Sequence, residues 1–123
     1  MKGLVWNCQS VHWRYDVDKH KATKCLLVYV CCEKGDTMEE AKEVVRRIHQ
    51  LNKKRYNKEH IVIFPFAHMS NHIMSGDEAK MLILEIMDRL SKTAYVHVLG
   101  FNKKKEIKIH LLPANADVSF FSY

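Results

Sequence analysis

The stretch His60-Ile-Val-Ile-Phe-Pro-Phe-Ala-His-Met-Ser70 decides how this chain folds. Ile61 to Phe64 form a short continuous apolar run of β-branched and aromatic residues, which predicts a strand buried on both faces. Pro65 ends this strand because proline has no N–H to donate to a neighbouring strand. The chain then leaves the sheet carrying an imidazole, His68, and a hydroxyl, Ser70, on a loop. In α/β proteins, a polar loop at the end of a buried strand commonly carries the chemistry.

The chain before this stretch is predicted to be mostly β-structure. Residues 2–8 predict a first strand, and Gln9-Ser10 predict a turn after it. Residues 12–17 alternate between apolar and polar side chains, which predicts a second strand. The longest apolar run, residues 24–32, predicts a central strand of the sheet.

Two amphipathic helices are predicted, each with a capping box at its start. Asp36 and Glu39 begin the first helix, and Ser75 and Glu78 begin the second. Apolar side chains recur at helical spacing and predict one buried stripe on each helix. These stripes are Ala41, Val44, Val45, Ile48 and Leu51 in the first helix, and Ala79, Leu82, Ile83, Ile86 and Leu90 in the second.

Two further strands are predicted at residues 95–99 and 104–111, and a tail with Pro113 and Asp117 follows them. The order of elements is therefore βββαβαββ, which predicts an α/β fold: a mixed sheet with two helices packed against it. The chain has 123 residues, no linker and no internal repeat. We expect residues 1–123 to form a single domain.

The charge of the chain indicates an anionic partner. The formal net charge is +6, and much of the excess lies in Lys53-Lys54-Arg55 and Lys103-Lys104-Lys105. A nucleic-acid backbone is the commonest partner of such a surface, and a solvated lysine-rich surface is the alternative. No apolar run is long enough to cross a membrane, and no leader peptide is evident. We therefore expect a cytoplasmic protein without a membrane partner.

No metal or cofactor motif is present. His68 and His72 are four residues apart, a spacing that binds metal on a helix. Pro65 and Asn71 argue against a helix here, and no third ligand is close in sequence. The four cysteines form no CxxC pair, and we expect them to be reduced. A nucleophile elbow, a Walker loop and a dinucleotide fingerprint are all absent, so no cofactor is expected.

One lysine of the last predicted strand has an unusual position. Ile107, Ile109 and Leu111 share one face of residues 104–111, and parity places Lys105 on that same apolar face. An ammonium group on a core-facing side needs water, an anion or another partner. The alternative is that the strand begins at Lys105 and the side chain simply reaches out to solvent.

These residues together carry a family resemblance. Phe64-Pro-Phe-Ala-His-Met-Ser70 resembles the Tyr-Pro-Phe-Ala-His-Leu-Ser motif of the N-terminal editing domain of archaeal threonyl-tRNA synthetases. The resemblance extends over the whole chain and implies a D-aminoacyl-tRNA deacylase-like fold. It places the family's histidine at His68, its lysine at Lys105 and its late glutamate at Asp117. The sequence departs from the family pattern at Lys104, where the family has tyrosine, and at Asp117, which is shorter than glutamate by one methylene.

The resemblance implies that the chain proofreads L-Ser-tRNA(Thr) by hydrolysing the ester, assisted by the 2′-hydroxyl of the tRNA and without a cofactor. The implied catalytic residues are Lys105, His68 and Asp117. The predicted substrate-binding residues are Pro65, Phe66, Ala67, Met69 and Ser70. The predicted tRNA-binding residues are Lys53, Lys54, Arg55, Lys103 and Lys104.

Two other functions fit the same residues. One is a D-aminoacyl-tRNA deacylase, which shares the fold, and the other is a non-catalytic module for tRNA binding or dimerisation. The partners expected from the resemblance are the acceptor end of tRNA(Thr), a second copy of the chain in a homodimer, and a synthetase catalytic domain in cis or in trans.

Overall fold

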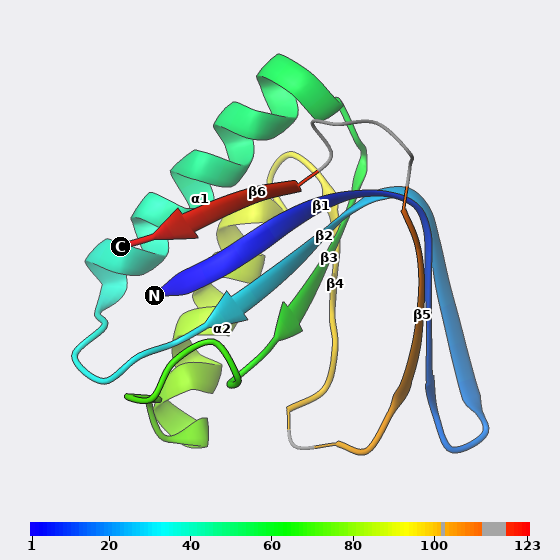
Figure 1. Ribbon diagram of the computed structural model, residues 1–123. Helices are drawn as coiled ribbons and strands as arrows, with labels where there is room; N and C mark the ends of the chain where they lie inside the picture. The colour runs from blue at the N-terminus through cyan, green and yellow to red at the C-terminus, as the bar shows by residue number, and fades with distance from the viewer. Residues whose placement is uncertain (102, 112–117) are drawn as a thin grey trace.

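The computed structural model describes residues 1–101, 103–111 and 118–123. Over these residues the chain forms a six-stranded mixed sheet with both helices on one face (Figure 1). The strands are β1 (Lys2–Tyr15), β2 (Asp18–Cys31), β3 (His60–Pro65), β4 (Tyr95–Val98), β5 (Glu106–Leu111) and β6 (Val118–Ser122). The helices are α1 (Met38–Leu51) and α2 (Gly76–Leu90), and a π-helical turn, η1 (Asn52–Tyr56), extends α1. The predicted α/β class, a mixed sheet with two helices packed against it, is confirmed.

The strand order is β4-β3-β2-β1, and the long strand β1 pairs with both β5 and β6. Strands β2, β3 and β4 are parallel, because α1 and α2 each return the chain to the start of the next strand. The pairs of β1 with β2, β5 and β6 are antiparallel. The carboxyl ends of β2, β3 and β4 therefore meet at one edge of the sheet.

The turn predicted at Gln9-Ser10 is wrong. Strand β1 continues through these residues, and the chain reverses later, at Asp16. The sheet instead bends here: the register between β1 and β5 shifts between Cys8 and Ser10, and Lys24 on β2 has a positive φ of 48°. These irregularities change the parity of burial, as a β-bulge does, so that Cys8 and Val11 both face the inner side of the bend.

The predicted start of the first helix is also wrong, by one residue. The N-cap of α1 is Thr37, whose N–H donates to Glu40 and whose hydroxyl accepts from the N–H of Glu39. Asp36 is not the cap because its carboxylate accepts instead from the amino group of Met1 and from the N–H of Glu33. The predicted cap of α2 is confirmed, since the hydroxyl of Ser75 accepts from the N–H of Glu78.

Strand β6 lies in the segment for which the sequence predicts only a tail. It alternates in burial, with Ser119 and Phe121 buried, and it pairs with the first half of β1. Phe121 packs against Gly3, where a β-carbon would collide with the Phe121 ring and with the backbone of Tyr29. Pro113 and Asp117 lie outside the described residues.

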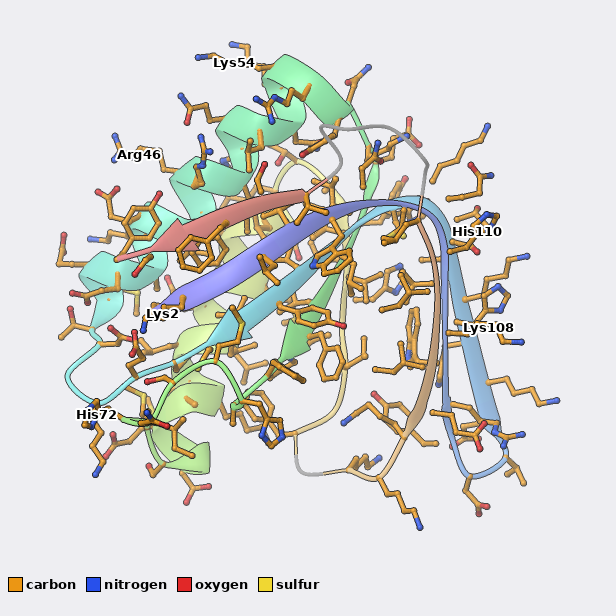
Figure 2. The ribbon with its side chains drawn as sticks, in the orientation of Figure 1. Lys2, Arg46, Lys54, His72, Lys108 and His110 are labelled. Atoms are coloured by element: carbon orange, nitrogen blue, oxygen red, sulfur yellow. The ribbon has the colours of Figure 1, made fainter. Side chains whose placement is uncertain are left out.

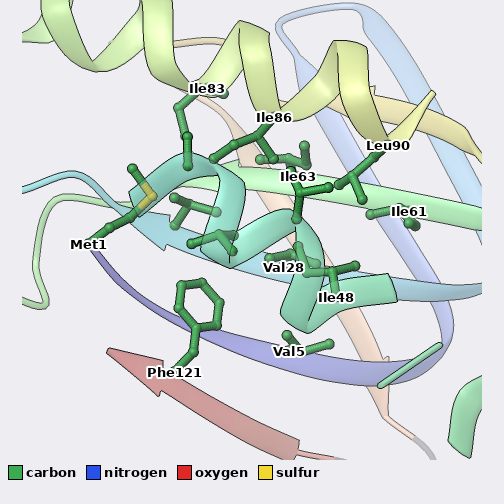
Figure 3. Packing of buried hydrophobic residues seen from close by; sticks show 14 of the residues in the cluster. Met1, Val5, Val28, Ile48, Ile61, Ile63, Ile83, Ile86, Leu90 and Phe121 are labelled. Carbon is green, nitrogen blue, oxygen red and sulfur yellow. The ribbon is translucent and has the colours of Figure 1, made fainter. Parts of the chain in front are cut away.

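Two apolar clusters stabilise this arrangement. The larger one lies between the sheet and the helices, where Ile83 and Ile86 of α2 pack over Ile61 and Ile63 of β3 (Figure 3). The predicted stripe of α1 is entirely buried in it. The smaller cluster fills the inner side of the bend and includes Trp13. In the described part of the chain, no helix combines the length and the apolar character that crossing a membrane requires.

Candidate active site

A pocket of about 190 Å³ lies where the carboxyl ends of β2 and β3 meet the start of α2. Its walls come from the end of β2, from the loop after β3, from the first turns of α2 and from the loop after β4. The residues that line it are Val30, Cys32, Pro65, Phe66, Ala67, Ile73, Met74, Gly76, Ala79, Ile83, Gly100, Phe101 and Lys105. Pockets at this edge of a parallel sheet are where α/β proteins bind their ligands.

Lys105 is the only charged side chain among the described residues that line this pocket. It is half-buried and directly precedes β5, and its Nζ donates to the carbonyl of Lys103 at 2.7 Å. Burial lowers the pKa of the Lys105 ammonium below its ordinary value. The following inward residues, Ile107 and Ile109, pack on the smaller apolar cluster. Lys105 therefore faces the side that strand parity predicts, and its ammonium lies at the pocket.

His68 lies beside this pocket without lining it. Its side chain is exposed, and its ring meets the Phe66 ring edge-on, with ring centres 5.2 Å apart. Phe66 in turn packs edge-on against Phe64, at 5.5 Å, and the ammonium of Lys105 lies over the Phe64 ring. The imidazole and the ammonium thus contact two neighbouring rings of one aromatic group, on the same side of the molecule.

The loop after β3 is fastened to the end of β2. The N–H of Phe66 donates to the carbonyl of Val30 at 2.9 Å, and the N–H of Met74 donates to the carbonyl of Cys32 at 3.1 Å. Between them, the hydroxyl of Ser70 donates to the carboxylate of Glu33 at 2.7 Å. This hydrogen bond is the main reason that the pKa of Glu33 is lowered. The loop is therefore anchored to the end of β2 at three points.

Of the five predicted substrate-binding residues, the structure brings three to the pocket. Pro65, Phe66 and Ala67 line it, whereas Met69 and Ser70 do not. Ser70 instead anchors the loop, since its hydroxyl also accepts from the N–H two residues further on.

The loop that carries Lys105 is held by Tyr15, which sequence reasoning did not single out as a site residue. The N–H of Gly100 donates to the Tyr15 hydroxyl at 2.5 Å, and the ammonium of Lys103 lies 4.9 Å from the centre of the Tyr15 ring. Tyr15 is the last residue of β1, and only the pairing of β1 with β5 brings it to this loop. Its role has no signal in the local sequence.

The two lysine-rich runs lie at opposite ends of the molecule. Lys104 and Lys105 line a second hollow beside the pocket. Lys53, Lys54 and Arg55 belong to η1, at the end of α1 remote from the pocket edge (Figure 2). The 14 residues of α1 span roughly 21 Å, so this run is far from Lys105.

Two predicted features remain. Asp117 lies outside the described residues. Among the described residues, no group of three metal-ligating side chains is close enough to hold an ion, which includes the surroundings of His68 and His72.

Comparison with protein families finds one family model that matches most of the chain. Residues 1–113 match the family described as the archaea-specific editing domain of threonyl-tRNA synthetase. The threonine–tRNA ligase of Methanococcus maripaludis is 30% identical over 96 residues, or 76% of this chain, and that of Nanoarchaeum equitans is 30% identical over 99 residues, or 79%. The chain spans about 15% of the length of these two relatives.

Solved structures show the same fold. A c-Myc DNA unwinding element binding protein superposes with a TM-score of 0.82 at 13% sequence identity, covering 100% of this chain and 99% of that one. A protein described as a probable eukaryotic D-amino acid tRNA deacylase superposes with a TM-score of 0.71 at 12% identity, covering 98% and 97%. The D-aminoacyl-tRNA deacylase-like fold implied by the family resemblance is confirmed.

Proposed function

We propose that this chain, which belongs to the archaea-specific editing domains of threonyl-tRNA synthetase, hydrolyses the ester of serine mischarged onto tRNA(Thr). The observation that carries the proposal is the Lys105 ammonium, the one charged group among the described residues lining a small pocket, beside the loop that bears His68. Family membership indicates the class of reaction, and the pocket indicates that Lys105 takes part in it.

The size of the pocket supports a small amino acid, and serine is the small amino acid that a threonine site rejects least well. A synthetic site built for threonine rejects serine only by a missing methyl group, worth about 1–3 kcal/mol or about 10–200-fold. A second site that accepts serine and excludes the larger side chain supplies the remaining selectivity. The pocket, at about 190 Å³, is smaller than the range of about 300–1,000 Å³ usual for drug-sized ligands.

The proposed reaction needs no protein nucleophile. Water attacks the ester carbonyl, the carbon–oxygen bond to the ribose breaks, and serine and the free ribose hydroxyl are released. The vicinal ribose hydroxyl assists the proton transfer, as the family resemblance implies. The negative charge that develops on the carbonyl oxygen needs donors that are already in place.

Two positive groups at the pocket can meet that charge. The Lys105 ammonium is one. The other is the N-terminal end of α2, whose residue Gly76 lines the pocket, since the first N–H groups of a helix carry partial positive charge. His68 then holds the ribose or the amino group of serine, and Asp117 orients Lys105 or that amino group, in the roles that the resemblance implies.

The proposed partner is the acceptor end of tRNA(Thr). Lys103 and Lys104 lie next to the pocket and can reach the phosphates of the acceptor end. Lys53, Lys54 and Arg55 can contact only a part of the tRNA remote from the ester. A synthetase catalytic domain, in cis or in trans, is the source of the mischarged tRNA. Such a step of translation takes place in the cytoplasm.

A homodimer is the second proposed association. On the face of the sheet opposite the helices, Phe120, Leu4, Tyr29 and Phe64 are register partners in one row across β6, β1, β2 and β3. Phe120 is 57% exposed and its neighbour Val118 is 47% exposed. We propose that a second copy covers this row. Phe120→Glu should then convert a dimer to a monomer in sedimentation equilibrium, and an unchanged molecular mass would contradict this interface.

The proposed hydrolysis is tested by comparing the deacylation of Ser-tRNA(Thr) and Thr-tRNA(Thr) by the wild type and by Lys105→Met. We expect fast release of serine, slow release of threonine and a loss of about 10²–10³-fold in the variant. Lys92→Met, at an exposed lysine after α2, is the matched control and should retain the wild-type rate. Equal rates for Lys105→Met and the wild type would remove Lys105 from the mechanism.

The same assay separates the two alternatives. Faster hydrolysis of D-Tyr-tRNA than of Ser-tRNA(Thr) would establish a D-aminoacyl-tRNA deacylase. Tight binding of tRNA without hydrolysis of either ester would establish a non-catalytic tRNA-binding module.

A further inference from the structure

A basic surface covers the outside of the bent part of the sheet. On β1, His12 is the register partner of Lys21 on one side and of Lys108 on the other. Directly paired residues point to the same face, and all three side chains are exposed. Lys108 projects outward from β5 at the edge of the molecule in Figure 2. These three residues form the first row of the surface.

A second row lies closer to the hairpin turn. Arg14 is the register partner of Lys19 on β2 and of Glu106 on β5. Arg14 and Glu106 form an ion pair at 2.7 Å. Within the two rows, no further carboxylate balances the charges of Lys19, Lys21 and Lys108. We call the two rows together the outer basic face. Trp13 lies between His12 and Arg14 in the sequence. Its side chain points to the opposite face of the sheet and is buried.

The outer basic face is continuous with the candidate active site. One hollow is lined by Arg14, Asp16, Lys104, Lys105 and Glu106, so it shares Lys105 with the pocket. A neighbouring hollow shares Arg14 and Glu106 with the first and extends to Lys108. Only the carboxylates of Asp16 and Glu106 interrupt this positive path.

We infer that the outer basic face binds the phosphate backbone of the tRNA acceptor stem while the 3′ end enters the pocket. The choice of RNA rests on the proposed function, and the placement rests on the path just described. Paired RNA is recognised through its phosphates and its shape more than through base edges. The backbone positions of Lys19 and Lys21 lie about 7 Å apart along β2, as the rise per residue of a strand requires. Those of Lys21 and Lys108 lie about 10 Å apart, which is two strand spacings.

Other occupants fit this face less well. A second copy of the same face would bring lysines against lysines, which opposes self-association. The run Lys53-Lys54-Arg55 is also basic, but η1 lies at the end of α1 remote from the pocket. A stem bound there would not deliver its 3′ end to Lys105. The outer basic face is therefore the one that connects stem binding to the reaction.

The test is the binding of deacylated tRNA(Thr), measured by fluorescence anisotropy over a range of salt concentrations. For Lys21→Ala/Lys108→Ala, the slope of log K against log salt should become shallower by about 1.4–1.8, because each lost phosphate contact contributes about 0.7–0.9. Affinity should fall about tenfold or more near physiological salt. Lys42→Ala/Lys92→Ala, which removes the same charge from exposed positions on α1 and after α2, should change both quantities much less.

Each contrary result overturns the inference. It fails if the slope of Lys21→Ala/Lys108→Ala stays at the wild-type value, or if Lys42→Ala/Lys92→Ala loses as much affinity. It also fails if a DNA duplex of equal length competes as well as an acceptor-stem RNA hairpin, because the face would then be a general polyanion surface. Unchanged melting temperatures show that both variants fold. Because the probe carries no ester, a failure of the proposed hydrolysis would appear only in the deacylation assay.

Discussion

The ammonium of Lys105 lies over the aromatic ring of Phe64, with Nζ 5.6 Å from the ring centre. This contact joins the start of β5 to the end of β3, two segments about forty positions apart in the sequence. It holds a cation at the mouth of a pocket whose other described lining residues are uncharged. A cation–π contact of this kind is worth about 0.5–1 kcal/mol at exposed sites.

Replacing the Phe64 ring should therefore weaken hydrolysis modestly. Phe64→Leu removes the ring and leaves Lys105 less well placed, and we expect single-turnover hydrolysis of Ser-tRNA(Thr) to slow by about 2–5-fold, which corresponds to about 0.5–1 kcal/mol. Phe64→Tyr keeps the ring and should retain the rate. A leucine variant as fast as the tyrosine variant would show that the ring does not position the ammonium.

The Tyr15 hydroxyl should matter for both stability and activity. Tyr15→Phe leaves the N–H of Gly100 without the partner it has at 2.5 Å, and we expect the free energy of unfolding to fall by about 1 kcal/mol. Hydrolysis should also slow, because the loop from Gly100 to Lys105 loses its anchor. Urea unfolding and the deacylation assay measure the two effects.

Tyr95→Phe provides the control for that substitution. The Tyr95 side chain is 66% exposed, so loss of its hydroxyl should change neither quantity. If Tyr15→Phe behaved like Tyr95→Phe, the hydroxyl would not fasten the loop.

The hydrogen bond from Ser70 to Glu33 predicts a pH-dependent stability. Because this bond favours the charged carboxylate, the folded-state pKa of Glu33 lies below its ordinary value of 4.5. The stabilisation is therefore present above about pH 4.5 and is lost as the pH falls through the folded-state value. Ser70→Ala should lower the free energy of unfolding by about 1–2 kcal/mol at pH 7. The difference in this free energy between the variant and the wild type should become smaller in acid.

A double-mutant cycle isolates this hydrogen bond. In a Glu33→Gln background, Ser70→Ala should cost clearly less at pH 7 than it does in the wild type. Equal costs in the two backgrounds, measured by urea unfolding, would show that the serine stabilises the loop by another contact, such as the one to the N–H of His72.

The wall of the pocket should determine which amino acid is accepted. Ile73 lines the pocket yet is 43% exposed, so Ile73→Ala should enlarge the pocket with little loss of stability. We expect hydrolysis of Thr-tRNA(Thr) to rise relative to Ser-tRNA(Thr), by up to about tenfold, since one methylene is worth about 1–3 kcal/mol. Met81→Ala, at a side chain of α2 that is 74% exposed, should leave the ratio unchanged. An unchanged ratio in Ile73→Ala would mean that this wall does not select the amino acid.

Elements whose signals are local can be read from the sequence alone. The run Ile61 to Phe64 is a buried strand, and the apolar stripes of both helices face the core, because burial follows the period of each element. Lys105 faces the apolar side because side chains alternate along a strand. The motif around His68 led to the right family, since the spacing of its residues is visible without the fold.

Features that depend on pairing between distant segments become visible only in the folded chain. Strand β1 continues through the bend at Cys8 and Lys24, where the sequence predicts a turn. The prediction fails because a bulge within a long hairpin interrupts the alternation of side chains in the same way as a turn does. Asp36 does not cap α1 because its carboxylate binds the amino group of Met1, a partner far away in the sequence. Tyr15 is brought to Gly100, and Lys108 into line with Lys21, by strand register alone. Register arises from contacts between strands, so no single stretch of the sequence contains it.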